Sequence, residues 1–156
     1  MSDKLDVVGI GNAMVDAIIP SNQSEIEKHE INRDSMNLID ENLKNNLHES
    51  YSIREMAGGG SLGNSMFGIT SFGGNGSFIG KIKNDEVGIF LQKDMVREGL
   101  QFPLGFTSPD ISTGCCTIFV EEDGTRTMCT FLGAGTLIGP DDINDQHIKN
   151  HKIAYL

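Results

Sequence analysis

The sequence predicts an α/β fold in which helices flank a mainly parallel sheet and a small antiparallel hairpin is attached. Strand-like and helix-like segments alternate twice between 51 and 99, the pattern of parallel strands joined by crossover helices. Two β-rich segments, 113–120 and 125–132, then flank Asp123-Gly124, a dipeptide typical of hairpin turns. We therefore expect a small separate sheet that covers a site; an edge hairpin without a functional role is the alternative.

The N-terminal part begins with a short, mostly apolar segment, which is typical of a buried parallel strand. Pro20 ends the extended chain that follows, and Asp40 has the side chain of a helix N-cap. The expected elements here are a strand at 5–10, extended chain at 17–20, a helix at 21–30 capped by Ser24, a short extended piece at 36–39, a helix from Asp40 to His48, and a strand at 51–56.

A glycine-rich stretch follows, with four glycines between Gly58 and Gly63 and polar side chains among them. Glycine lets the backbone approach a ligand closely, and a glycine turn that opens a helix points free N–H groups at whatever lies above. We interpret the stretch as the floor of a small-molecule site, opening a helix that ends near Phe72. A flexible surface loop before an ordinary helix is the alternative.

The second half contains a strand, a helix, the hairpin and a final helix and strand. Pro140 and the two acids after it suit the first turn of a helix. The expected elements are a strand at 77–82, a helix through Phe90 to Gly99, the hairpin at 113–132, a helix from Pro140 and a strand at 152–156. Because the sequence stops inside this last strand, we expect a fragment or a truncated gene product.

Length and charge limit the function. A chain of 156 residues suits one compact domain, and 12 basic against 22 acidic residues give a net charge of −10. This charge argues against binding to nucleic acids or anionic membranes. No apolar run approaches the roughly 20 residues of a membrane span, and charged Asp3 and Lys4 do not fit the start of a signal peptide.

The cysteines and histidines predict no disulfide and no metal site. The three cysteines, Cys115, Cys116 and Cys129, are odd in number and lie in strand-like segments, so we expect buried free thiols in a reducing, cytoplasmic compartment. His147 and His151 are four residues apart, a spacing that suits a metal, but a solvated helix face is the better interpretation.

Three segments together resemble the N-terminal part of the ribokinase-like (PfkB) carbohydrate kinase family, closest to its adenosine kinase branch. They are Gly11-Asn12-x-x-x-Asp16 after the first strand, the stretch from Gly59 to Ser65, and Gly80-Lys-x-x-Asn-Asp85-x-x-Gly88. The resemblance covers residues 1–156 and identifies the hairpin as part of that family's β-lid. It implies lid segments at about 13–20, 36–39, 51–57 and 111–135.

The resemblance implies transfer of a phosphoryl group from ATP, with Mg²⁺, to the hydroxymethyl group of a sugar or nucleoside. It places Asn12, Asp16, Gly59, Gly60 and Asn64 around this acceptor, and Met128 and Thr130 on the lid above it. The carboxylate of Asp16 can accept hydrogen bonds from two vicinal ribose hydroxyls, and the asparagines offer donors and acceptors. A solvated strand end for Asp16 and a helix cap for Asn64 stay open. We expect Arg126 to pair with Glu121 or Glu122 across the hairpin.

The family's catalytic base belongs to a downstream Asp-Thr-x-Gly-Ala-Gly-Asp motif, and its nucleotide pocket and magnesium-binding motif are also downstream. The segment from Gly133 to Thr136 resembles the first motif only superficially. We therefore assign no catalytic and no metal-binding residue to this chain and expect it to be inactive alone. The other hypothesis is a catalytically incomplete module that binds a sugar or nucleoside, or that forms a homodimer through the β-lid.

Overall fold

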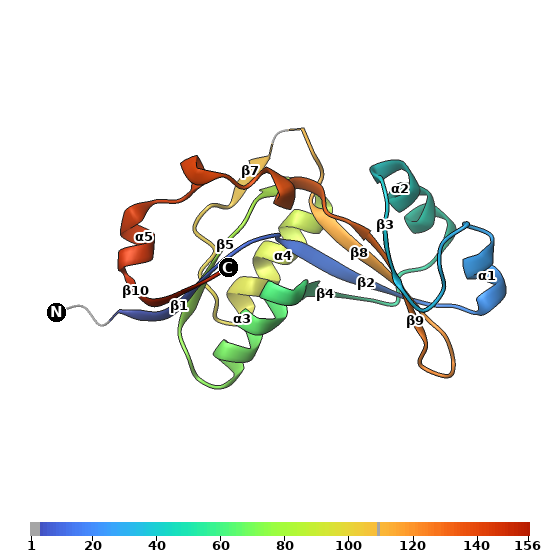
Figure 1. Cartoon of the computed structure of the whole chain (residues 1–156), viewed down its shortest axis with the longest axis horizontal. Coiled ribbons are helices and arrows are strands. Elements are labelled where there is room, and N and C mark those ends of the chain that lie inside the picture. Colours follow the sequence, from blue (N-terminus) through green and yellow to red (C-terminus); the bar gives the residue numbers. More distant parts are fainter. Residues whose placement is uncertain (1–3, 109) are drawn as a thin grey trace.

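The computed structural model describes residues 4–108 and 110–156, so Asp3 lies outside the described residues. The chain forms two main sheets that lie side by side along its long axis (Figure 1). A three-stranded sheet has the order β10-β1-β5, a five-stranded sheet has the order β3-β9-β8-β2-β4, and β6 pairs with β7. Within the described ranges, no helix has both the length and the apolar character that a membrane span requires.

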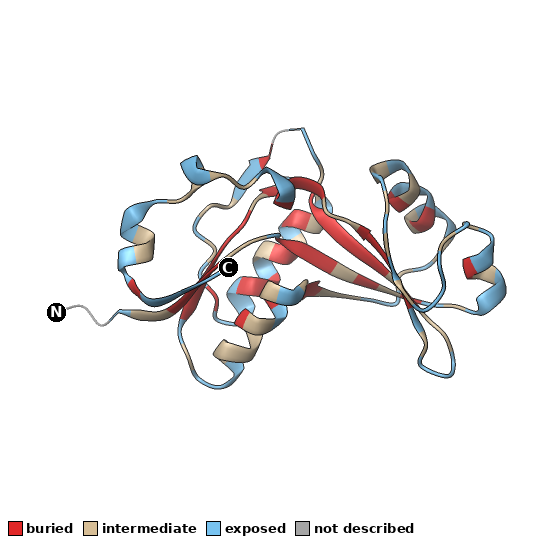
Figure 2. Ribbon diagram, in the orientation of Figure 1, coloured by how far each residue is buried: buried red, intermediate tan, exposed pale blue. Residues whose placement is uncertain are grey.

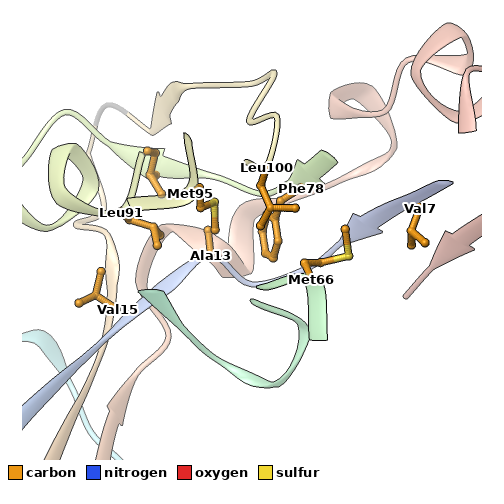
Figure 3. Close-up of a cluster of buried hydrophobic side chains, with 9 residues drawn as sticks. Val7, Ala13, Val15, Met66, Phe78, Leu91, Met95 and Leu100 are labelled. Atoms are coloured by element: carbon orange, nitrogen blue, oxygen red, sulfur yellow. The ribbon is translucent and has the colours of Figure 1, made fainter. Parts of the chain in front are cut away.

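The three-stranded sheet is parallel throughout, as predicted. β1 (Leu5–Ile10) lies between β5 (Gly76–Ile79) and β10 (His151–Tyr155). Helices α3 (Ser61–Ser71) and α4 (Glu86–Arg97) pack against this region. Their apolar side chains meet those of the strands in one buried cluster (Figure 3), whose members are Val7, Ala13, Val15, Met66, Phe78, Ile82, Leu91, Met95 and Leu100.

The five-stranded sheet contains the predicted hairpin. β8 (Gly114–Val120) and β9 (Arg126–Phe131) pair antiparallel, and so do β2 (Met14–Pro20) and β4 (Glu55–Gly59). The two remaining pairings, β2 with β8 and β3 (Met36–Leu38) with β9, are parallel, so the sheet as a whole is mixed.

Two helices cover one face of the five-stranded sheet. These are α1 (Gln23–Glu27) and α2 (Glu41–Ser50), which bury Ile26 and Leu47 against Phe119 of β8. Figure 2 shows buried residues along the strands and on the inner sides of these helices, whereas their outer sides are exposed. The opposite face of the sheet carries Asp16 and is the more open of the two. Asp16, Ile18, Ile118 and Met128 are partly exposed there, whereas Met14, Cys116 and Thr130 are buried.

Helix α4 is joined to the five-stranded sheet at Asp85, its N-cap residue. Its Oδ1 accepts the Gly88 N–H at 2.8 Å, and its Oδ2 accepts the Thr113 N–H at 2.9 Å. The hydroxyl of Thr113, which is fully buried, donates to Asp85 Oδ1 at 2.7 Å. One carboxylate therefore fixes the start of β8 against the first turn of α4.

Several predicted boundaries were wrong. The N-cap of α1 is Asn22, not Ser24, because Asn22 and Glu25 form a reciprocal capping box. The strand expected at 77–82 is interrupted after Ile79 and resumes as β6 (Ile82–Lys83), paired with β7 (Phe106–Ser108). The helix expected from Pro140 is a 3₁₀ turn, Pro140–Asp142, followed by the separate helix α5 (Asp145–Lys149).

Two predicted side-chain environments were also wrong. Glu121 pairs with Arg33, with 2.7 Å between Nε and Oε1, whereas Arg126 is exposed. His151 is not on a solvated helix face: it opens β10, is buried, and its Nε2 lies 2.7 Å from the Ser77 hydroxyl. Both interactions join segments far apart in the chain, which local spacing does not predict.

Asp40 is the N-cap of α2, as predicted, and its Oδ1 accepts the Leu43 N–H at 2.8 Å. Replacing Asp40 with alanine leaves that N–H without its partner, so we expect a loss of about 1 kcal/mol in the free energy of unfolding. Urea denaturation measures this loss. The exposed Glu49 in the same helix is the control, and its replacement by alanine should change stability by less than about 0.5 kcal/mol.

Candidate functional site

A cavity of about 330 Å³ opens where β1 ends and the chain turns into β2. Open α/β sheets bind ligands at this position, outside the carboxyl ends of their parallel strands. The walls come from the end of β1, the start of β2, the start of α3 and the segments after β9 and β10. The lining residues are Ile10, Gly11, Asn12, Met14, Gly60, Ser61, Leu62, Leu132 and Leu156.

The glycine stretch opens a helix, as predicted, but most of the expected turn is strand and not loop. Gly58 and Gly59 belong to strand β4, where they pair with Val15 and Met14 of β2. Only Gly60 makes the turn into α3, with a φ of +79° that side-chain-bearing residues rarely adopt. The stretch therefore forms the end of a strand beside the cavity, followed by a single-residue turn.

Gly59 provides the surface on which the side chain of Asp16 lies. A Cβ atom placed on Gly59 would be 2.2 Å from Asp16 Cγ and 2.3 Å from Oδ1. The carboxylate thus rests directly on the Gly59 backbone, in a space that any larger residue would fill. The Asp16 side chain is half-buried there, and this burial raises its pKa above the ordinary value of 3.8.

Because the folded-state pKa of Asp16 is raised, its protonated form favours folding below pH 3.8, and this contribution is lost as pH rises through the folded-state pKa. We expect Asp16→Asn to stabilise the ligand-free chain near pH 7 and to have no such effect below pH 3.8. Urea denaturation across this range measures the difference. Glu122→Gln, which neutralises an exposed acid, is the control for the change of charge.

A row of side chains crosses the open face of the sheet from Asp16. Asp16 is opposite Cys116 of β8, which is opposite Thr130 of β9, and directly opposed residues share a face. Thr130 Oγ1 donates to Cys116 Sγ at 3.3 Å, and two strand spacings place Thr130 about 10 Å from Asp16. Met128 lies on the same face one row further out, opposite Ile118.

The remaining predicted residues occupy two different settings. Asn12 is exposed and lines the cavity together with Gly60. Asn64 lies in the first turn of α3, is exposed, and is not among the lining residues; its backbone N–H donates to the Gly60 carbonyl at 2.9 Å. The structure therefore brings Asn12 and Gly60 to one cavity, places Gly59 under Asp16, and leaves Asn64 on the outer surface.

Sequence reasoning missed three residues near these groups. Gly135 lies against Asn12: a Cβ placed on it would be 3.0 Å from Asn12 Cα. Met14 packs on Gly60, and Cys116 lies between Asp16 and Thr130. The glycine run after the hairpin was a usable signal for Gly135, whereas the other two depend on strand register.

The cysteines are buried and free, as predicted. Burial raises the pKa of Cys115 to about 12 and that of Cys129 to about 11, so both thiols are protonated at neutral pH. Burial also raises the pKa of Cys116. A protonated thiol is a poor nucleophile, so none of the three suits covalent chemistry.

The described residues do not form a site that fits Mg²⁺. Over residues 4–108 and 110–156, no group of three or more His, Cys, Asp and Glu side chains gathers closely enough to hold a metal ion. Magnesium prefers carboxylate ligands together with phosphate oxygens and water. We therefore assign no chemical step to a metal ion within this part of the chain.

Comparison with known proteins gives consistent matches. A family model described as pfkB family carbohydrate kinase matches residues 5–156. The adenosine kinase from Sinorhizobium meliloti is 36% identical with a TM-score of 0.87, over 97% of this chain and 46% of that one. A probable sugar kinase from Rhizobium etli CFN 42 is 31% identical with a TM-score of 0.86, over 98% and 46%.

Among curated proteins, probable fructokinase-4 from Arabidopsis thaliana is 29% identical over 104 residues, which are 62% of this chain and 30% of that protein. The chain therefore spans less than half the length of each of these relatives. The structural matches confirm the predicted fold class.

Proposed function

The chain belongs to the pfkB family of carbohydrate kinases, and from this premise we propose that it supplies the acceptor-binding and lid half of a kinase. The proposed reaction transfers the terminal phosphoryl group of ATP to a hydroxymethyl group on a sugar or nucleoside. Sugar kinases and adenosine kinases are both among the similar proteins. The observation that carries the proposal is the half-buried Asp16 carboxylate on Gly59, facing the open side of the sheet.

Asp16 is proposed to hold two neighbouring hydroxyl groups of the acceptor. An ionised carboxylate has only acceptor sites, and its two oxygens match two vicinal hydroxyls. Gly59 lies under the Asp16 carboxylate, and Gly60 lines the cavity beside Met14. Asn12, exposed at the rim of the cavity, offers a donor and an acceptor to the same ligand. Asn64 stays a weaker candidate, since it reaches the acceptor only if the ligand extends over the first turn of α3.

The five-stranded sheet is proposed to act as the lid, with Met128 and Thr130 above the acceptor. Met128 and Thr130 share the face of Asp16. Closure of this sheet would exclude water, which competes with the acceptor for the phosphoryl group. Phosphoryl transfer depends mostly on positioning and on charge stabilisation. We propose that the described residues position the acceptor. We therefore expect the chain alone to bind an acceptor without turnover.

Calorimetry of the 156-residue chain with adenosine and with ribose, together with an assay of ATP consumption, tests this proposal. Binding of either ligand without turnover supports it, provided that Asp16→Asn abolishes the binding. Failure of the chain to bind any member of a panel of sugars and nucleosides would contradict it. Equal affinities of the Asp16→Asn variant and the unmodified chain for the ligand would overturn the proposed role of Asp16.

A second candidate function is self-association through the lid. Met36 and Leu38, on the edge strand β3, are 56% and 65% exposed, and they share a face with Ile18, Ile118 and Met128. Sedimentation equilibrium of the chain and of Leu38→Lys tests this candidate. A dimer that Leu38→Lys dissociates would support it, and a monomer at all concentrations would exclude it.

A further inference from the structure

Asp94, outside the proposed acceptor site, is a buried acid in the last turn of helix α4. Its Oδ2 accepts the backbone N–H of Gly58 at 2.8 Å, and this hydrogen bond is buried. Its other oxygen pairs with Arg97, one turn further along the helix and mostly exposed. Acidic side chains are almost never fully buried unless they have such partners, so the position of Asp94 calls for a specific reason.

The reason lies in strand β4, which is at the edge of the five-stranded sheet and, among the described strands, pairs only with β2. N–H groups on the free side of an edge strand have no neighbouring strand to accept them. Asp94 accepts one of these N–H groups, and it does so at Gly58. A Cβ on Gly58 would be 2.6 Å from Phe67 Cζ and 3.0 Å from Asp94 Oδ2, so α3 and α4 both approach β4 where it has no side chain.

The next residue in β4 is Gly59, on which the Asp16 carboxylate lies. A displacement of β4 at Gly58 would therefore move the surface that supports Asp16. We propose that Asp94 is a positioning residue for the acceptor subsite: by holding Gly58, it fixes β4 and thereby the place and orientation of the Asp16 carboxylate. This inference rests on the proposed function only for the identity of the ligand.

Asp94→Ala removes the acceptor of the Gly58 N–H, while Asp94→Asn keeps an oxygen that can accept it. Met95→Ala is the matched control, since Met95 is fully buried in the same helix and packs in the core. Asp94→Ser, whose shorter side chain does not reach Gly58, replaces the alanine variant if that variant fails to fold. All variants are made in the 156-residue chain.

Two properties of each variant are measured, and the first measurement needs no ligand. The pKa of Asp16 is measured by carbon NMR of its carboxyl group, and binding of adenosine and ribose is measured by calorimetry. We expect Asp94→Ala to lower the pKa of Asp16 toward its ordinary value and to weaken binding at least about tenfold, which corresponds to the loss of one hydrogen bond to the Asp16 carboxylate. The Asp94→Asn variant should keep the raised pKa of Asp16 and most of the affinity for the ligand.

Met95→Ala is expected to lower the melting temperature without changing the pKa of Asp16. If Asp94→Ala changes neither measurement, or if Met95→Ala changes both to the same extent, Asp94 has only a structural role and the proposal is wrong. If the unmodified chain binds neither ligand but Asp94→Ala still lowers the pKa of Asp16, the proposed function fails while the positioning by Asp94 is supported.

Discussion

Replacing Asp16 with alanine is expected to weaken acceptor binding by at least about 100-fold. A hydrogen bond to a charged group contributes about 1.5–3 kcal/mol, and the loss of two such bonds exceeds the 2.8 kcal/mol or so that corresponds to 100-fold. Calorimetry with adenosine and ribose measures the change. The same replacement removes a half-buried carboxylate, so the variant should fold at least as well near pH 7 as the unmodified chain.

Arg126→Ala is the control for this experiment. Arg126 is exposed at the start of β9, and Glu121, one of its two expected partners, pairs with Arg33 instead. Its removal should change affinity by less than about twofold, as expected for a surface charge. Equal losses of binding from Asp16→Ala and Arg126→Ala would show that Asp16 has no specific place in the site.

The second large effect is expected from Gly59→Ala. The added methyl group would lie 2.2 Å from Asp16 Cγ, well inside van der Waals contact, so the carboxylate must leave its position or β4 must move. We expect a loss of affinity of about 100-fold, because the displaced carboxylate loses two hydrogen bonds to the acceptor, each of about 1.5 kcal/mol or more. The free energy of unfolding should fall by about 1–3 kcal/mol, the usual cost of overpacking.

Gly68→Ala provides a matched control for Gly59→Ala. Gly68 lies inside α3, and a Cβ placed there meets no atom within 4 Å. Alanine at this position should stabilise the chain by about 0.5–1 kcal/mol and leave binding unchanged. Acceptor affinity in Gly59→Ala close to that of the unmodified chain would rule out the contact between Gly59 and Asp16 as a requirement for binding.

Local signals in the sequence predicted much of the fold. Asp123-Gly124 predicted the hairpin, and Asp40 predicted the start of α2, because turn and capping chemistry depend on neighbouring residues. The alternating strands and helices predicted the parallel sheet. The pairing of β2 with β4, which turns Gly58 and Gly59 into strand residues, depends on a partner some 40 residues away and has no local signal.

The candidate site was predicted only in part, for the same reason. Asn12, Asp16, Gly59 and Gly60 were proposed from motif spacing and the family resemblance. The structure brings Asn12 and Gly60 to one cavity and places Gly59 under Asp16, which lies on β2 of the five-stranded sheet. Asp94 was not identified, because an acid within a helix is normally a surface residue. Its burial follows from the close packing of α4 on the edge of β4, which only the folded chain creates.

The short connection between β1 and β2 has a mechanical consequence. It spans residues 11–13, and it carries the chain from one sheet directly into the other (Figure 1). Asn12 lies on this connection, while Asp16 lies beyond it on β2. A molecule held by both side chains would bridge the joint and resist bending of one sheet relative to the other. The ligand would thus couple the two sheets mechanically, in addition to filling the cavity beside their connection.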